Sequence, residues 1–218
     1  VPHQAYQAVS YAVENDWTAA SYWYEAMALM GDRASSVSLN GLQDNSRQGD
    51  ATVKYIFSLL GIRTAFSTPG DGSPQGITLT YRKFHLPYME YNFAGQPDLA
   101  QSVAATCAAL GTRFRFTGLS SLRIKETDRL SALVAEMRKL GYQLQTTTDD
   151  ELIWDGALCQ ADPVPVINTY NDHRMAMAFA PLAIKHPGLR IDAPDVVSKS
   201  YPQFWHELEH AGFSVAPC

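Results

Sequence analysis

An internal repeat is the feature that most constrains what this chain can fold into. Three alanine-rich segments, with bulky apolar residues between the alanines, each follow an aspartate: Asp16, Asp98 and Asp172. Such segments are typical of helices that are buried on most sides. An aspartate directly before a helix caps its free backbone N–H groups. The pattern therefore predicts three buried helices, each with an aspartate at its N-cap or in its first turn.

Each predicted helix is followed by the same order of elements: a strand, a loop, a second helix and a closing strand. Two units add one more strand. The first strands are expected at residues 36–39, 113–117 and 189–191, and the second helices at 51–60, 126–140 and 202–210. The closing strands are expected at 63–66, 142–146 and 213–215, and the additional strands at 76–81 and 151–154. Three such units predict a single α/β (α+β) domain over residues 1–218, with packed helices covered by sheets. We expect residues 68–75 to form a surface turn.

The composition argues against several classes of function. A net charge of −5 and a pI near 5.6 are unfavourable for a protein that acts on nucleic acid or an anionic membrane. No apolar run approaches the roughly 18 residues that a membrane-spanning helix needs. The three cysteines lack zinc-ligand spacing, so we expect no metal site and a cytoplasmic protein, with Cys107 as a buried free thiol. Any anionic ligand must therefore bind at a local basic cluster.

Residues 123–130 carry the strongest candidate for such a cluster. Lys125 and Arg129 are four residues apart, and Glu126 and Arg129 are three apart, so all three can converge at the start of the predicted helix. Two cations beside free N–H groups favour an anion site. The alternative is a solvated first turn with local ion pairs.

Two further helix starts carry cations. Arg174 enters a helix whose next residues are apolar, and a buried guanidinium needs an anionic partner. His173, beside it, is as compatible with a packing role as with a catalytic one. Taken alone, Lys199 is predicted to be an ordinary exposed lysine. However, Asp98, Lys125, Arg174 and Lys199 occupy equivalent parts of the repeat. Equivalent positions lie at one end of a threefold domain, so together they predict a site for a multiply charged anion.

These segments resemble a known family. Residues 123–130 and 171–177, together with residues 16–22, 45–50 and 97–98 in the same order, are similar to the C-terminal half of EPSP synthases (3-phosphoshikimate 1-carboxyvinyltransferases). The resemblance spans about residues 14–204. It implies a domain of three βαβαββ-type units with buried parallel helices, and an active site in the cleft between two such domains. It also implies enolpyruvyl transfer from phosphoenolpyruvate to the 5-hydroxyl of shikimate 3-phosphate, in aromatic amino-acid biosynthesis, without a metal or organic cofactor.

The resemblance also implies roles for individual residues. Asp98 is similar to the carboxylate that takes the proton of the attacking hydroxyl, Lys125 to the lysine between the two substrates, and Glu126 to the group that transfers a proton at the methylene carbon. Cations similar to those that hold phosphoenolpyruvate are Arg129, Arg174 and Lys199. Asp172 and His173 would shape the site. Ser121 stands where the family commonly has an asparagine against the shikimate phosphate ester.

The N-terminal half of the family pattern is absent from this sequence. The start at Val1, without Met, indicates a fragment boundary, and the missing domain is the expected partner. We therefore expect the isolated chain to be inactive. Two alternatives stay open: the sister enzyme, UDP-N-acetylglucosamine enolpyruvyl transferase, and a non-catalytic domain of the same fold.

Overall fold

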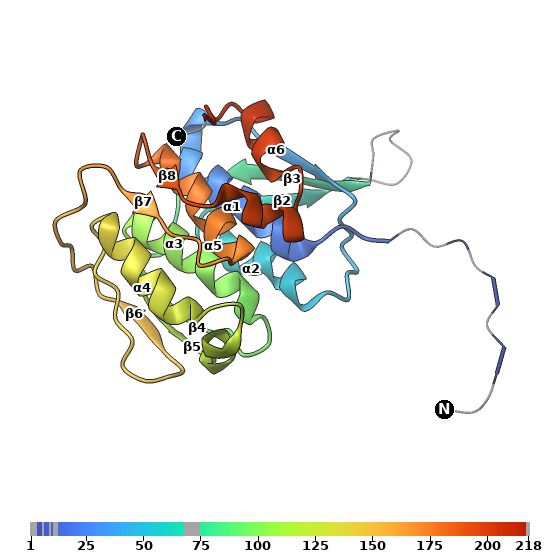
Figure 1. Cartoon of the computed structure of the whole chain (residues 1–218). Helices are drawn as coiled ribbons and strands as arrows, with labels where there is room; N and C mark the ends of the chain where they lie inside the picture. The colour runs from blue at the N-terminus through green and yellow to red at the C-terminus, as the bar shows by residue number, and fades with distance from the viewer. Residues whose placement is uncertain (1–3, 6, 9, 11–12, 68–74, 217–218) are drawn as a thin grey trace.

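Three helices occupy the centre of the molecule in the computed structural model, which describes residues 4–5, 7–8, 10, 13–67 and 75–216. They are α1 (Trp17–Met30), α3 (Ala100–Leu110) and α5 (His173–Phe179). Helix α3 packs between α1 and α5, and most of their side chains are buried (Figure 1). The three buried helices expected from the repeat are confirmed. Of the expected surface turn at residues 68–75, all but residue 75 lies outside the described residues.

The strands form three small sheets around these helices. The first sheet has the order β1-β3-β2 and is antiparallel, the second has the order β4-β5-β6, and the third pairs β7 with β8. Strands β4 and β5 are parallel, as are β7 and β8, whereas β6 is antiparallel to β5. The bounds are β1 (Val37–Asn40), β2 (Ile62–Phe66), β3 (Gly76–Tyr81), β4 (Tyr88–Asn92), β5 (Arg113–Thr117), β6 (Leu152–Trp154), β7 (Val166–Ile167) and β8 (Arg190–Ile191).

Two expected strands are wrong and two strands were not predicted. Residues 142–146 make only isolated bridges, Tyr142 to Leu158 and Gln145 to Ile153. Residues 213–215 have no strand partner in the described part of the chain and are irregular. Strands β4 and β7 precede α3 and α5, so each unit that contains them opens with a strand parallel to its next one.

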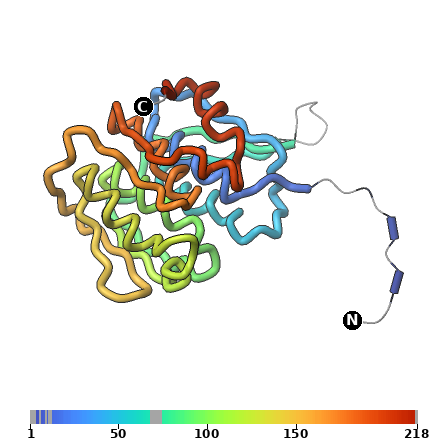
Figure 2. The backbone as a smooth tube through the Cα atoms, viewed as in Figure 1, coloured from blue at the N-terminus to red at the C-terminus, as the bar shows by residue number. Residues whose placement is uncertain are grey.

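The second helices are α2 (Val53–Ser58), α4 (Arg129–Lys139) and α6 (Phe204–His210). The C-terminal segment that ends in α6 lies beside α1 (Figure 2), where Trp23 Nε1 donates to Tyr201 Oη at 3.1 Å. Helix α4 begins three residues later than expected, because the Asp128 side chain caps it by accepting from the Ser131 backbone N–H at 3.1 Å. Lys125 and Glu126 therefore lie in the loop before the helix rather than in its first turn.

Two of the three aspartates take the expected N-cap placement. Asp16 accepts from the backbone N–H of Thr18 at 2.8 Å, and Asp172 accepts from that of Arg174 at 2.9 Å. Asp98 takes the other expected placement, the first turn, because it lies inside a 3-10 turn, Pro97–Leu99, that runs into α3 without a side-chain cap. Its carboxylate is left free to bind cations from other helix starts.

Candidate active site

Arg129, the first residue of α4, is a buried cation with three carboxylate partners. Its side chain is 2% exposed. Nε donates to Asp172 at 2.6 Å, Nη1 to Asp98 at 2.9 Å and Nη2 to Glu126 at 2.7 Å. The Asp172 side chain is completely buried, so its charge depends on this contact. Three segments of the chain are thereby tied together at one point.

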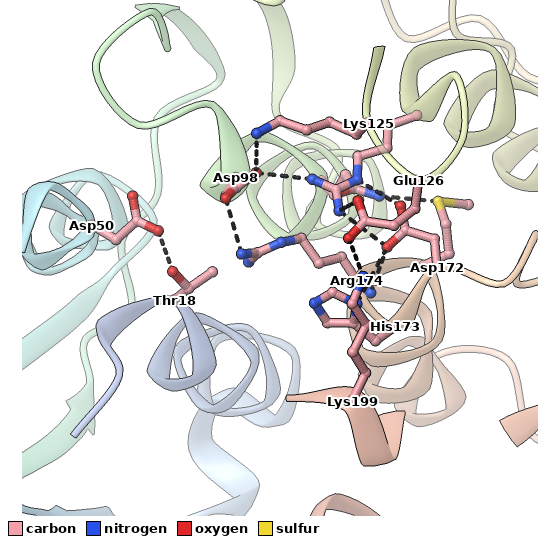
Figure 3. Close-up of polar contacts among 12 residues, drawn as sticks. Thr18, Asp50, Asp98, Lys125, Glu126, Asp172, His173, Arg174 and Lys199 are labelled. Atoms are coloured by element: carbon pink, nitrogen blue, oxygen red, sulfur yellow. Dashed lines mark hydrogen bonds and ion pairs between the residues drawn. The ribbon is translucent and has the colours of Figure 1, made fainter. Parts of the chain in front are cut away.

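Asp98 joins this centre to two more cations. Its Oδ2 forms an ion pair with Arg174 Nη2 at 2.9 Å, and its Oδ1 lies 3.8 Å from Lys125 Nζ. Figure 3 shows Asp98 between the side chains of Lys125 and Arg174. Because Asp98 comes from the start of α3 and Arg174 from the start of α5, the helix starts meet at one end of the molecule, as expected. Asp98 is therefore an ion-pairing residue and not a helix cap.

Glu126 links the loop before α4 to the end of the chain. Its Oε1 accepts from Lys199 Nζ at 2.6 Å, and Lys199 ends the 3-10 turn Pro194–Lys199. The hydrogen bond from Lys199, with the charge of Arg129, lowers the pKa of Glu126 to about 2. Glu126 is therefore ionised at neutral pH in this arrangement.

We call these residues the ion cluster: Asp98, Lys125, Glu126, Arg129, Asp172, Arg174 and Lys199. Cations outnumber carboxylates, so the cluster favours an incoming anion over a cation. The side chains of Arg174 and Lys199 are 16% and 59% exposed, so ligands can reach both. Of the residues expected at the site, Ser121 alone stays apart, since no hydrogen bond or ion pair joins it to the cluster in the described residues.

Two buried polar atoms near the cluster lack a hydrogen-bond partner among the described residues. They are the Tyr22 hydroxyl and His173 Nδ1. Burial raises the pKa of Tyr22, which the nearby charge of Arg174 opposes. Burial, assisted by the same charge, lowers the pKa of His173, which favours the neutral imidazole. A ligand that supplied a partner to either atom would relieve the cost of burying it.

Thr18 and Asp50 extend the site on its far side, and neither was predicted from the sequence as a site residue. The Thr18 hydroxyl donates to the Asp50 carboxylate (Figure 3). Burial raises the pKa of Asp50, a shift that the Thr18 hydrogen bond opposes. The signal was present, since Asp50 ends one of the family-like segments, but nothing in its spacing placed it near Arg174.

Other site types find less support in the described residues. There, no group of three or more His, Cys, Asp or Glu side chains is arranged to hold a metal ion. Likewise, no helix in that part of the chain is long and apolar enough to cross a membrane. The ion cluster is thus the main group of interacting ionisable side chains in the described residues.

The fold and the cluster define a class of protein, an α/β domain with an anion site at the starts of its repeated helices. Comparison with known proteins agrees with this class. The profile of the family described as EPSP synthase (3-phosphoshikimate 1-carboxyvinyltransferase) matches residues 1–208. The chain belongs to the EPSP synthase family.

Individual relatives carry the same name and are longer. A 3-phosphoshikimate 1-carboxyvinyltransferase from Bacteroides fragilis (strain YCH46) is 46% identical over 215 residues, which cover 99% of this chain and 50% of that protein. One from Methanoculleus marisnigri is 32% identical over 96% of this chain and 46% of its own length. The solved EPSP synthase from Acinetobacter baumannii has a TM-score of 0.61 at 20% identity, over 93% of this chain and 47% of that one. The chain therefore spans about half the length of the curated relatives it matches.

Proposed function

We propose that this chain supplies one half of an active site that transfers the enolpyruvyl group of phosphoenolpyruvate to the 5-hydroxyl of shikimate 3-phosphate and releases phosphate. The observation that carries the proposal is the ion cluster, in which cations from separate helix starts surround three carboxylates. Addition to phosphoenolpyruvate needs a base at oxygen, an acid at carbon and fixed positive charge around the donor. The names of the matched relatives favour the shikimate substrate over a UDP-sugar.

The cations of the ion cluster fall into two groups, according to whether a ligand can reach them. Arg174 and Lys199 each hold one carboxylate and are partly exposed, so in the proposal they bind the carboxylate and phosphate of phosphoenolpyruvate directly. Arg129 is buried and its donors are occupied, so it adds positive charge from behind. Asp172 fixes Arg129, and His173 shapes the wall beside Arg174. Binding is an exchange in which the ligand replaces internal carboxylates as the partner of these cations.

The proton-transfer roles fall to the loop before α4 and the start of α3. Asp98 would accept the proton of the attacking hydroxyl, with Lys125 at the junction of the two substrates. Glu126 would deliver a proton to the methylene carbon, yet its pKa of about 2 leaves it ionised while Lys199 holds it. The proposal therefore requires Lys199 to move to the incoming anion, which releases Glu126 to take up a proton. Ser121 would face the shikimate phosphate.

In the same proposal, residues 1–218 form the single C-terminal domain of a two-domain enzyme, and the missing domain is its partner. The twofold greater length of the relatives supports this view. Alone, the chain would bind phosphoenolpyruvate weakly and turn over nothing, because one wall of the site is absent and orientation is lost. The alternative is a non-catalytic binding domain of the same fold.

Reconstitution tests the proposal. The chain is mixed with the separately produced N-terminal half of the Bacteroides fragilis relative, and phosphate release from both substrates is measured. We expect release from the mixture and none from either half. A titration of the chain alone with phosphoenolpyruvate, followed by amide shifts around Arg174, separates failed assembly from failed binding. Absence of both signals would refute the proposal, and binding without turnover would favour the non-catalytic alternative.

Two variants in the active mixture separate binding from proton transfer. Arg174→Ala should raise the KM for phosphoenolpyruvate, with a loss of about 2–4 kcal/mol in kcat/KM for removing one partner of a desolvated charge pair. Asp98→Asn should lower kcat roughly 10²–10⁴-fold if Asp98 is the base. A stable Asp98→Asn protein with nearly normal kcat would eliminate that role.

A further inference from the structure

A second surface lies away from the ion cluster, along the free edge of the first sheet. Strand β2 is the last strand of the order β1-β3-β2, so one of its edges has no strand partner in the described residues. A cavity of about 310 Å³ runs between this edge and helix α2. The arrangement of an edge strand facing a helix across a groove is one in which extended peptides bind by adding a strand.

The backbone N–H and C=O groups of every second residue of β2 point into this groove. In the ladder with β3, Arg82 N–H donates to Gly61 O at 2.7 Å, and Ser67 N–H donates to Gly76 O at 3.0 Å. Antiparallel pairing alternates, so the odd-numbered residues of β2 bond to β3. The backbone groups of Ile62, Thr64 and Phe66 consequently face the free edge. They offer both donors and acceptors, which match another backbone better than they match a simple anion.

The charge on this surface indicates the side chains of the partner. Arg63 and Arg82 line the cavity, are exposed and take part in no ion pair within the described residues. Arg82 extends the ladder opposite Gly61, so the register places it on the same face of the sheet as Arg63. An added strand would present every second side chain on that face, opposite Arg63. Acidic residues there would pair with both arginines.

The other face of the groove is apolar and aromatic. The Lys54 ammonium lies 4.9 Å from the Phe66 ring centroid and 5.2 Å from that of Tyr55. Asp44 already neutralises this lysine at 2.7 Å, and the Lys54 side chain is only 10% exposed. Tyr55 is 64% exposed, so its ring is free to cover an incoming side chain. Apolar residues fit this wall.

We propose that the groove between β2 and α2 binds an extended acidic peptide segment of another protein by strand addition, with acidic residues alternating with apolar ones. Backbone hydrogen bonds to Ile62, Thr64 and Phe66 give the affinity. The two arginines select acidic side chains, and the aromatic wall selects apolar ones. The site needs neither the ion cluster nor the missing half of the parent protein.

The test is a titration of the whole 218-residue chain with acetyl-Glu-Val-Glu-Val-Glu-amide, followed by backbone amide shifts. We expect shifts at Ile62, Thr64 and Phe66 at peptide concentrations up to about 2 mM, the range of weak complexes with few contacts. The same peptide with N-methylated valines cannot donate along the edge and should not bind. Arg63→Gln with Arg82→Gln should weaken binding about two- to tenfold at low salt, as two exposed charge pairs would.

A matched pair of variants tests the backbone contact itself. Thr64→Pro removes an edge N–H, whereas Thr64→Val keeps it, and both lose the hydrogen bond between the Thr64 and Tyr24 hydroxyls. Peptide binding should be lost in the first variant and kept in the second. Equal binding of the N-methylated peptide would overturn the proposal even if Thr64→Pro failed to fold. The proposal would also be overturned if the amide signals of Ile62, Thr64 and Phe66 did not shift. Displacement of the peptide by equimolar inorganic phosphate would overturn it as well.

Discussion

Two buried ionisable side chains, Arg129 and Glu25, are treated in opposite ways by this fold. Arg129 lies at a helix start, is 2% exposed and contacts three carboxylates. Glu25 lies in the middle of α1, is 0% exposed, and neither of its carboxylate oxygens has a hydrogen-bond partner in the described residues. Burial raises the pKa of Glu25 well above its ordinary value. One group is buried as a charge and the other is buried as a neutral acid.

The difference teaches where this fold keeps charge. At the helix starts, aspartates, arginines and lysines from separate units converge, and each desolvated charge meets an opposite one. Around Glu25, in the middle of α1, no such partner is found in the described residues, so this carboxyl group is tolerated in its protonated form. The buried carboxylates that do have partners are Asp172 of the ion cluster, beside Arg129, and Glu136 of α4, beside Lys139.

The largest test of this comparison removes the partnered cation. Arg129→Met leaves the buried Asp172 carboxylate without its guanidinium, so we expect the free energy of unfolding at pH 7 to fall by about 3–5 kcal/mol. A urea titration with a common m-value measures this change. As a control, Lys125→Met should cost less than about 1 kcal/mol, because that lysine is partly exposed and lies 3.8 Å from Asp98. Similar losses for both variants would show that the buried position of Arg129 has no special importance.

The second test removes Glu25, the buried acid without a partner. Its folded pKa is raised, so its contribution to stability is full below the unfolded value of 4.5 and disappears as the pH rises toward the folded pKa. The free energy of unfolding should thus fall with rising pH across that window. Glu25→Leu should remove this dependence and stabilise the chain at pH 7 by about 2–4 kcal/mol.

Glu25→Gln sharpens the same test, because glutamine cannot ionise but keeps a buried polar group. It should flatten the pH profile while stabilising less than leucine does. Urea titrations at pH 4.5 and pH 8 measure both effects. A wild-type slope in either variant would mean that Glu25 finds a partner or solvent in solution.

The smallest effect is expected at Glu126, which is charged, partnered and partly exposed. Its folded pKa of about 2 lies below the ordinary value of 4.5, so its contribution is present above pH 4.5 and is lost as the pH falls toward 2. Glu126→Gln should cost less than about 1 kcal/mol at pH 7, since solvent screens such pairs. Carboxyl-carbon NMR of Glu126 should show the low pKa, and Lys199→Ala should raise it. An unchanged titration would remove Lys199 as its cause.

The repeat in the sequence predicted the three central helices and most of the strands because long alanine-rich helices and alternating strands depend on local pattern. It also predicted which cations would meet, since equivalent positions of a repeat lie at one end. Local pattern could not decide between a cap and a first-turn position for Asp98, which lies in the first turn because a 3-10 turn precedes α3. Strand β4 alternates buried and exposed side chains, a signal that was available and missed.

The sequence could not predict contacts between residues that are far apart along the chain. The contact between Asp50 and Thr18 joins residues 32 positions apart, and no spacing rule connects them. Strand β7 has only two residues, too few for any periodic signal, and exists because β8 lies beside it. The strand expected at residues 142–146 is reduced to two isolated bridges, Tyr142 to Leu158 and Gln145 to Ile153. Tertiary partners decided each of these cases.

The buried thiol of Cys107 in α3 can be used to measure how often α3 and α1 separate. It is free and completely inaccessible, and burial raises its pKa, so it cannot react with an alkylating reagent while the helices are closed. Cys159 is also free and partly exposed, and provides an internal reference. The rate at which iodoacetamide modifies Cys107 in native buffer therefore reports how often the helical core opens, without any denaturant.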